Sequence, residues 1–208
     1  MPQLNRKALV STQNLTVISI LAAISAVLYM VEIPVVLFYK LDFSNLPVLL
    51  GTFAMGPFAG MLVLLVKDLL GLLHSSSQGV GEIADFLTAL AMIIPAGLIY
   101  QKDKSRNSAV LGMAVGAVAA SLVGVFSNVY LLVPFYGVVY GMPVAQIVSM
   151  GQALVPAVDS LWKFVFMITA PFNLLKWIAL SVMGALMYKP LSPILHGHTR
   201  RAAGGKKS

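Results

Sequence analysis

The sequence predicts an all-α integral membrane protein, a bundle of six transmembrane helices, and three observations lead to this fold class. First, 59% of the 208 residues are hydrophobic and only 10% are charged, whereas a soluble domain is roughly one-quarter charged. Second, apolar runs long enough to cross a bilayer recur along the chain. Third, the net charge of +7 gathers in short basic clusters. This pattern is typical of a multi-pass protein in a lipid bilayer and not of a nucleic-acid surface.

The apolar runs give the candidate spans in chain order. The first, residues 15–33, is longer than the apolar core of a signal peptide, so we interpret it as a retained span. Three polar or mixed regions lie between the later spans: residues 34–45, the turn-rich residues 74–81, and a mixed region over residues 134–170. The later apolar runs cover residues 46–66, 83–100, 109–132 and 171–188.

The dipeptide Gly56-Pro57 decides the topology. Glycine followed by proline is a strong turn signal, and proline suits the first turn of a new helix. We therefore divide this run into a short helix over residues 42–55 and a span over residues 58–73. The short helix is expected either to be partly shielded by protein or to begin inside the loop. The basic clusters at Arg6-Lys7, 102–106 and 200–207 then fall on one side, which the positive-inside rule makes cytoplasmic.

This topology predicts one six-helix membrane domain, residues 1–190, followed by a basic cytoplasmic tail, residues 191–208. Both termini are expected to be cytoplasmic. The polar loops, and a substrate pocket among them, are expected on the outer side.

Two amides and one cation are the strongest candidates for a ligand site. Asn173 and Lys176 open the last apolar run and share one helix face, and Asn128 lies in the outer half of the fifth span near the aromatic Tyr136. Amides donate and accept hydrogen bonds at once, so this set suits a flat, neutral heterocycle. In the alternative, the asparagines tie helices together and Lys176 extends towards water.

Other charged residues lie within or beside the spans. Lys67 and Asp68 diverge by about 100° on a helix, and separate interhelical contacts are favoured over an ion relay because no further buried acids are evident. Glu82 and Asp85 begin the fourth span, where capping of the helix N-terminus is expected. Glu82 also borders the outward loop, which makes a ligand contact an alternative.

The first span carries a face of small residues. Ala22 and Ala26 have the spacing that lets helices approach closely. Internal packing and docking of another membrane subunit are equally compatible with this pattern.

Several chemistries lack the residues they need. The chain has no cysteine, its three histidines do not form a metal constellation, and no phosphate-binding loop or hydrolase motif occurs. We expect no enzyme activity, no metal and no resident cofactor.

An ordered set of motifs resembles the riboflavin-binding S components of energy-coupling factor (ECF) transporters. The motifs are Leu41-Asp42-Phe43-Ser44-Asn45-Leu46-Pro47, Gly56-Pro57-Phe58-Ala59-Gly60, Val66-Lys67-Asp68-Leu69-Leu70, Asn128 with Leu131-Leu132-Val133-Pro134-Phe135-Tyr136-Gly137, and Pro171-Phe172-Asn173-Leu174-Leu175-Lys176. They occur in the family's order over residues 14–188, while residues 141–162 look longer than the family's usual loop.

The resemblance implies a bacterial plasma-membrane subunit that captures riboflavin as a transported substrate. It implies Asn128, Asn173 and Lys176 as polar contacts, beneath a first loop that carries Lys40, Asp42 and Phe43. It also implies that the Ala22/Ala26 face meets a transmembrane coupling subunit, which joins two cytoplasmic ATPases. The alternatives are another vitamin, a flavin nucleotide, or a stand-alone ion-coupled carrier that uses Lys67 and Asp68.

Overall fold

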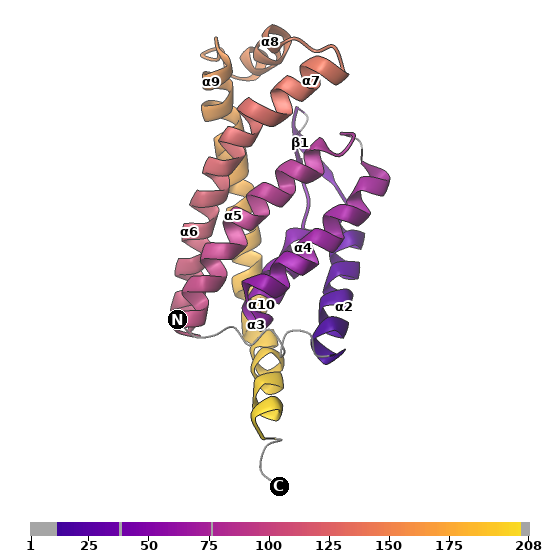
Figure 1. Cartoon of the computed structure of the whole chain (residues 1–208). Coiled ribbons are helices and arrows are strands. Elements are labelled where there is room, and N and C mark those ends of the chain that lie inside the picture. Colours follow the sequence, from indigo (N-terminus) through magenta and orange to yellow (C-terminus); the bar gives the residue numbers. More distant parts are fainter. Residues whose placement is uncertain (1–11, 38, 76, 205–208) are drawn as a thin grey trace.

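A computed structural model describes the backbone of residues 12–37, 39–75 and 77–204, and side chains as far as residue 187. It is a helical bundle with one small β-hairpin (Figure 1). Among these described residues, five helical segments are long and apolar enough to cross a membrane: Thr12–Tyr29, Pro57–His74, Val80–Lys102, Arg106–Val139 and Leu161–Met187. The prediction of a helical, multi-pass membrane protein is confirmed.

The elements follow one another as a helix, a hairpin and then a series of helices. The first part comprises α2 (Thr12–Tyr29), β1 (Ile33–Val36), β2 (Tyr39–Leu41), α3 (Asn45–Met55), α4 (Pro57–Gly71) and the 3-10 turn η1 (Leu72–His74). The second comprises α5 (Val80–Lys102), α6 (Arg106–Ser127), the π-helical turn η2 (Asn128–Leu132), α7 (Val133–Val139), α8 (Val144–Leu154), α9 (Leu161–Phe164), the π-helical turn η3 (Val165–Thr169) and α10 (Ala170–Gly204).

The turn between α3 and α4 is the one that Gly56-Pro57 predicts. Gly56 has φ +101° and ψ 167°, and Pro57 is the first residue of α4. This backbone conformation is open to glycine and strained for other residues. Helix α3 has only 11 residues, and those from Asn45 to Phe53 are buried, so the shielding expected for such a short helix is present.

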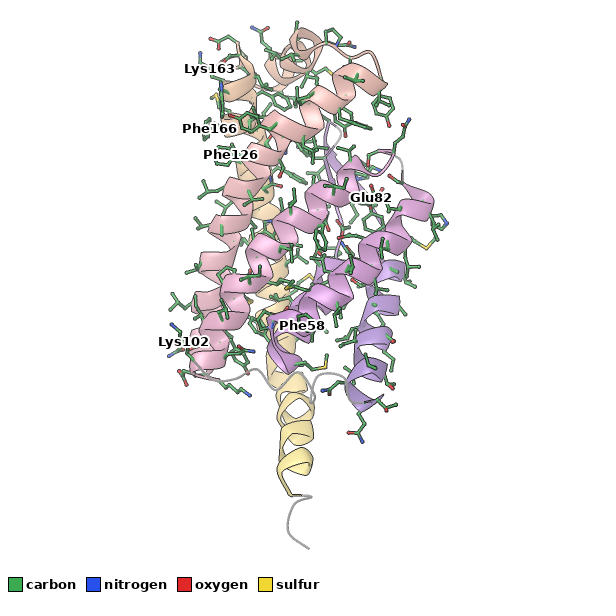
Figure 2. The ribbon with its side chains drawn as sticks, in the orientation of Figure 1. Phe58, Glu82, Lys102, Phe126, Lys163 and Phe166 are labelled. Carbon is green, nitrogen blue, oxygen red and sulfur yellow. The ribbon has the colours of Figure 1, made fainter. Side chains whose placement is uncertain are left out.

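The bundle has two distinct ends. One end holds the start of α2, the α3–α4 turn, the α5–α6 connection and the C-terminal part of α10 (Figure 1); we call it the basic end. The opposite end, the hairpin end, holds the β-hairpin and helices α7 to α9. Figure 2 places Phe58 and Lys102 towards the basic end and Glu82 and Lys163 towards the hairpin end.

Small residues bring α5 and α6 into close contact. A Cβ atom added to Gly112 would lie 2.8 Å from the Ala96 carbonyl oxygen, and one added to Gly116 would lie 2.5 Å from that of Met92. Only glycine permits this backbone approach. The resulting α5–α6 pair forms one wall of the bundle (Figure 1).

The last membrane helix begins ten residues earlier than predicted. It starts at Leu161 and not at Pro171, because α9, η3 and α10 form one continuous segment. Asn173 and Lys176 therefore lie well inside a long helix. The prediction that they open the last membrane helix is wrong.

The two π-helical turns share a position relative to proline. η2 ends two residues before Pro134, and η3 ends two residues before Pro171. Proline cannot donate a backbone hydrogen bond and collides with the carbonyl four residues earlier, so a wider preceding turn relieves the conflict. Both helices thus continue through a proline that the sequence suggested as a boundary.

The hairpin end has its own apolar core. Tyr39 and Phe172 belong to it together with Ile147, Phe164 and other residues of the α7–α9 region. A Cβ atom on Gly151 would lie 2.4 Å from the Phe164 ring, so α8 packs directly on α9. The region over residues 134–170, which the sequence analysis described only as mixed, forms a helical cap over this end (Figure 1).

Candidate functional site

A cavity at the hairpin end collects polar side chains from most of the bundle. Its lining comes from the end of α2, the hairpin, the loop before α5, α5 itself, the α6–η2 junction, α7 and α10. The lining residues used below are Tyr29, Glu32, Tyr39, Lys40, Asp42, Ser77, Asp85, Gly124, Asn128, Tyr136, Phe172 and Asn173.

Tyr39 fixes the hairpin to the two π-helical turns. Its hydroxyl donates to Asn128 Oδ1 at 2.7 Å and lies 2.5 Å from Thr169 Oγ1. Its ring stacks on Phe172, with centroids 5.0 Å apart and planes 24° from parallel. Asn128 begins η2 and Thr169 ends η3, so the contact joins both helices at the points where they widen.

The two predicted asparagines face the same cavity from α6–η2 and α10. Asn128 also donates through Nδ2 to the Gly124 carbonyl oxygen at 2.8 Å. Asn173 packs on the same glycine, because a Cβ atom there would lie 2.2 Å from Asn173 Nδ2. Among the described residues no hydrogen-bond partner reaches the Asn173 amide, so its donors and acceptor are available to a ligand.

Lys176 lies behind this wall and is bound by two carboxylates. Its Nζ donates to Asp42 Oδ2 at 3.0 Å and to Asp85 Oδ1 at 3.1 Å. Both acids line the cavity, and the Lys176 residue is 8% exposed. An ammonium has three N–H donors, and these two contacts use two of them.

Asp85 connects Lys176 to Lys67. Lys67 Nζ lies 2.5 Å from Asp85 Oδ2 and 2.8 Å from Asp68 Oδ1. Asn45 donates to both Asp85 oxygens, at 3.1 and 3.0 Å. The expectations of separate contacts for Lys67 and Asp68, of no further buried acids, and of a capping role for Asp85 are therefore wrong.

Two features explain why these predictions failed: the position of Asp85 in its helix and the burial of Lys67. Asp85 is the sixth residue of α5, which begins at Val80, so it lies beyond the reach of the unpaired N–H groups at the helix start. Lys67 is buried and its neighbours come from three helices. A buried ammonium requires such carboxylate partners.

Glu82 stays in the first turn of α5 but bonds side chains. It accepts hydrogen bonds from Tyr29 at 2.8 Å, from Ser75 at 2.8 Å and from Ser77 at 3.1 Å. Tyr29 and Ser77 line the cavity, whereas Glu82 is set one layer behind them. The contact ties α2 to the loop before α5.

The remaining predicted residues divide between the cavity and its surroundings. Lys40 lines the cavity and pairs with Glu32, and Tyr136 also lines it. Phe43 packs against the main bundle core. Of the predicted set, the structure brings Asn128, Asn173, Lys40, Asp42 and Tyr136 to the cavity surface, whereas Lys176, Phe43 and Glu82 do not line it.

The face of small residues on α2 points partly inwards. Ala22 is 1% exposed and belongs to the bundle core, and Ala26 is half-buried. Ser19 and Ala23 are exposed. Internal packing therefore accounts for Ala22, and a partner on this helix would meet its exposed neighbours.

Sequence reasoning missed Tyr39, Tyr29, Phe172 and Asp85 as cavity residues. The signal available for Tyr39 was an aromatic hydroxyl in a polar loop next to Lys40. For the others, the sequence offered no sign that the hairpin and α10 would meet beside α5. Within the described residues no group of histidine and acidic side chains has the arrangement of a metal site.

A helical membrane bundle with an amide-lined polar cavity at one end defines a membrane protein that binds a small polar molecule. The family model described as "ECF transporter, substrate-specific component" matches residues 13–188. The chain therefore belongs to the substrate-specific components of ECF transporters.

Named relatives cover nearly the whole chain. A riboflavin transporter RibU of Staphylococcus aureus is 32% identical, over 91% of this chain and 97% of its own. A riboflavin transporter FmnP of Bacillus subtilis is 25% identical, over 87% and 93%. A solved S component of a bacterial ECF transporter superposes with TM-score 0.69 at 33% identity, covering 87% of this chain and 96% of its own.

Proposed function

We propose that this protein is the riboflavin-capturing subunit of an ECF transporter. The observation that carries the proposal is the cavity that Asn128 and Asn173 line from two helices. The relatives are named as riboflavin transporters, and the similarity covers most of their length. Both facts support the choice of ligand.

The chemistry of riboflavin matches the lining. Its pyrimidine edge presents an N–H between two carbonyls, and an amide can satisfy both kinds of group. Asn173 has its hydrogen-bonding capacity available, and Lys176 supplies a positive charge close behind the wall. The rings of Phe172 and Tyr136 line the cavity and offer apolar faces to the flat ring system, as small-molecule sites commonly do.

The proposal includes the orientation of the protein in the membrane. Counting α3 together with the five longer segments gives six membrane helices, which form a domain over residues 1–190. Residues 191–208 are a basic cytoplasmic tail. The positive-inside rule makes the basic end cytoplasmic. The cavity then opens towards the outside, where riboflavin is captured.

The partners follow from the family. A transmembrane coupling subunit and two cytoplasmic ATPases would supply the energy, because no nucleotide-binding motif occurs in this sequence. We propose that the coupling subunit contacts α2 through Ser19 and Ala23, with Ala26 at the edge of the contact and Ala22 packed inside.

Purification tests the ligand directly. The protein purified from riboflavin-containing medium should be yellow, and adding the stripped protein to riboflavin should quench flavin fluorescence at nanomolar to micromolar concentration. A colourless protein with no quenching would refute riboflavin as the substrate.

Competition with FMN tests the choice between flavins. The cations at the cavity are already paired with carboxylates: Lys40 with Glu32, and Lys176 with Asp42 and Asp85. A phosphate would therefore have to compete with these carboxylates for positive charge. We expect FMN to compete at least about tenfold more weakly than riboflavin. Uptake by vesicles that contain this subunit alone would instead favour an ion-coupled carrier.

A further inference from the structure

Asp85 is the junction of a buried ionic cluster beneath the cavity. One of its oxygens accepts from Lys176 of α10 at 3.1 Å, and the other accepts from Lys67 of α4 at 2.5 Å. Asn45 of α3 donates to both. One carboxylate of α5 thus joins three other helices at the level of the cavity wall.

The charges in this cluster are unequal. Three carboxylates, those of Asp42, Asp68 and Asp85, face two ammonium groups, those of Lys67 and Lys176. Each lysine has a carboxylate of its own, Asp68 at 2.8 Å and Asp42 at 3.0 Å, and the two lysines share Asp85. Asp85 is thus not required to neutralise either lysine.

What Asp85 supplies is a second fixed point for the Lys176 ammonium. A lysine side chain has a flexible four-carbon stem, and one acceptor leaves its end free to swing. Asp42 lies just after the hairpin, whereas Asp85 is held within α5 by Lys67 and Asn45. Two acceptors on different elements fix the position of Nζ relative to Asn173, one helical turn away on α10.

We infer that Asp85 is a positioning residue that holds the Lys176 ammonium in place for the ligand. The inference rests on the proposed function, because it takes riboflavin as the probe. It assigns to Lys67 and Asn45 the task of holding Asp85, and it predicts that Asp85 acts on binding only through Lys176.

A double-mutant cycle in riboflavin titrations tests this dependence. Asp85→Asn keeps the size of the side chain and removes its charge. In the parent protein it should weaken riboflavin binding about tenfold or more, and in a Lys176→Met background less than about threefold. Asp85→Glu keeps the charge, so its riboflavin affinity should lie between that of the parent protein and that of Asp85→Asn.

Asp68→Asn is the matched control. It removes the same charge from the same cluster, but Asp68 contacts Lys67 and not Lys176. We expect a loss of less than about threefold. An equal loss for Asp68→Asn and Asp85→Asn would show an effect of cluster charge in general, and would overturn the positioning role.

Two further results would also overturn it. An undiminished effect of Asp85→Asn in the Lys176→Met background would mean that Asp85 acts on the ligand without Lys176. Additive shifts in the thermal unfolding of the four ligand-free proteins would mean that the two side chains do not hold each other. The unfolding cycle needs no ligand, so it tests the coupling of Asp85 to Lys176 even if the parent protein fails to bind riboflavin. Such a failure to bind would refute the proposed function and leave the coupling test valid.

Discussion

Tyr39 shows how a single side chain can organise the cavity. A tyrosine hydroxyl is protonated at physiological pH, and burial raises the pKa of the Tyr39 hydroxyl further above the ordinary value. It can then donate to Asn128 while it accepts from Thr169. This fixes the orientation of the Asn128 amide, and with it the group that Asn128 offers to a ligand.

Tyr39→Phe should therefore weaken binding without removing the ring. Stacking on Phe172 would remain, whereas Asn128 Oδ1 would lose its donor and the amide could rotate. Since a neutral hydrogen bond contributes about 0.5–1.5 kcal/mol, we expect an affinity loss of about twofold to tenfold by fluorescence titration. Tyr130→Phe is the control, because Tyr130 is 69% exposed; an equal loss there would rule out this role of Tyr39.

Lys176→Met should reduce both affinity and stability. Hydrogen bonds to a charged group are worth about 1.5–3 kcal/mol, so riboflavin binding should fall about tenfold to 150-fold if the ammonium contacts the ligand. Asp42 and Asp85 would also lose a shared cation, and the thermal unfolding midpoint should drop. Lys163→Met breaks a solvent-exposed pair and should change neither value; unchanged affinity in Lys176→Met would exclude Lys176 from binding.

Among single residues, the sequence identified the amides better than the acids. Asn128 and Asn173 stood out because amides are costly within apolar runs, and both line the cavity. Asp85 did not stand out, because a carboxylate near a helix start has an ordinary explanation in capping. Its true partners are 18 and 91 residues away in the chain, and no local pattern reports contacts at that separation.

At the scale of elements, the contact between α6 and α10 depends on a glycine. Gly124 leaves room for Asn173, whose Nδ2 would lie 2.2 Å from an added Cβ atom. Both residues line the cavity, so any side chain at position 124 must displace the amide. The distance between these two helices is therefore matched to the ligand site.

Gly124→Ala should separate binding from stability. The new methyl group would push Asn173 out of position and lower riboflavin affinity about threefold to tenfold. The unfolding midpoint should not fall, because alanine favours the helix over glycine by about 1 kcal/mol and Asn173 can move into the cavity. In Gly137→Ala, where the nearest atom lies at 3.6 Å, affinity should be unchanged. A midpoint that falls together with affinity in Gly124→Ala would point to misfolding.

Helix boundaries were predictable where proline and glycine together indicate a turn. Gly56-Pro57 is a turn, as predicted. Pro134 and Pro171 were interpreted as the edges of irregular structure, yet both continue a helix after a π-helical turn. Sequence patterns do not distinguish a proline that ends a helix from one that a wider turn accommodates, so the true start of the last helix was missed. The short strands β1 and β2 were missed as well.

For the molecule as a whole, the distribution of charge agrees with the arrangement of the ends. The α3–α4 turn, the α5–α6 connection and the C-terminal part of α10 gather at the basic end (Figure 1). This common location required the two-helix interpretation of residues 46–66, so a single dipeptide settled the arrangement of the bundle. The helical cap over residues 134–170 depends on packing between distant segments and could not be predicted in the same way.

Labelling of single cysteines tests the orientation in the membrane. The sequence contains no cysteine, so an introduced thiol gives a signal without background. Lys104→Cys, at the α5–α6 connection, should react with an impermeant maleimide only after the membrane is opened. Asp159→Cys, in the exposed part of the cap, should react on intact cells. The reverse labelling pattern would show that the proposed topology is inverted and that the cavity opens towards the cytoplasm.

The paired π-helical turns make the ligand site sensitive to the number of residues in the chain. Each such turn accommodates one residue more than an α-helix would, and one residue corresponds to about 100° of rotation. Deleting a residue within η2 would turn α7 relative to α6, and Tyr136 would leave the cavity although no side chain had been replaced. In homologous chains, a gap of one position at residues 128–132 or 165–169 therefore signals a reshaped pocket even where every aligned pocket residue is identical.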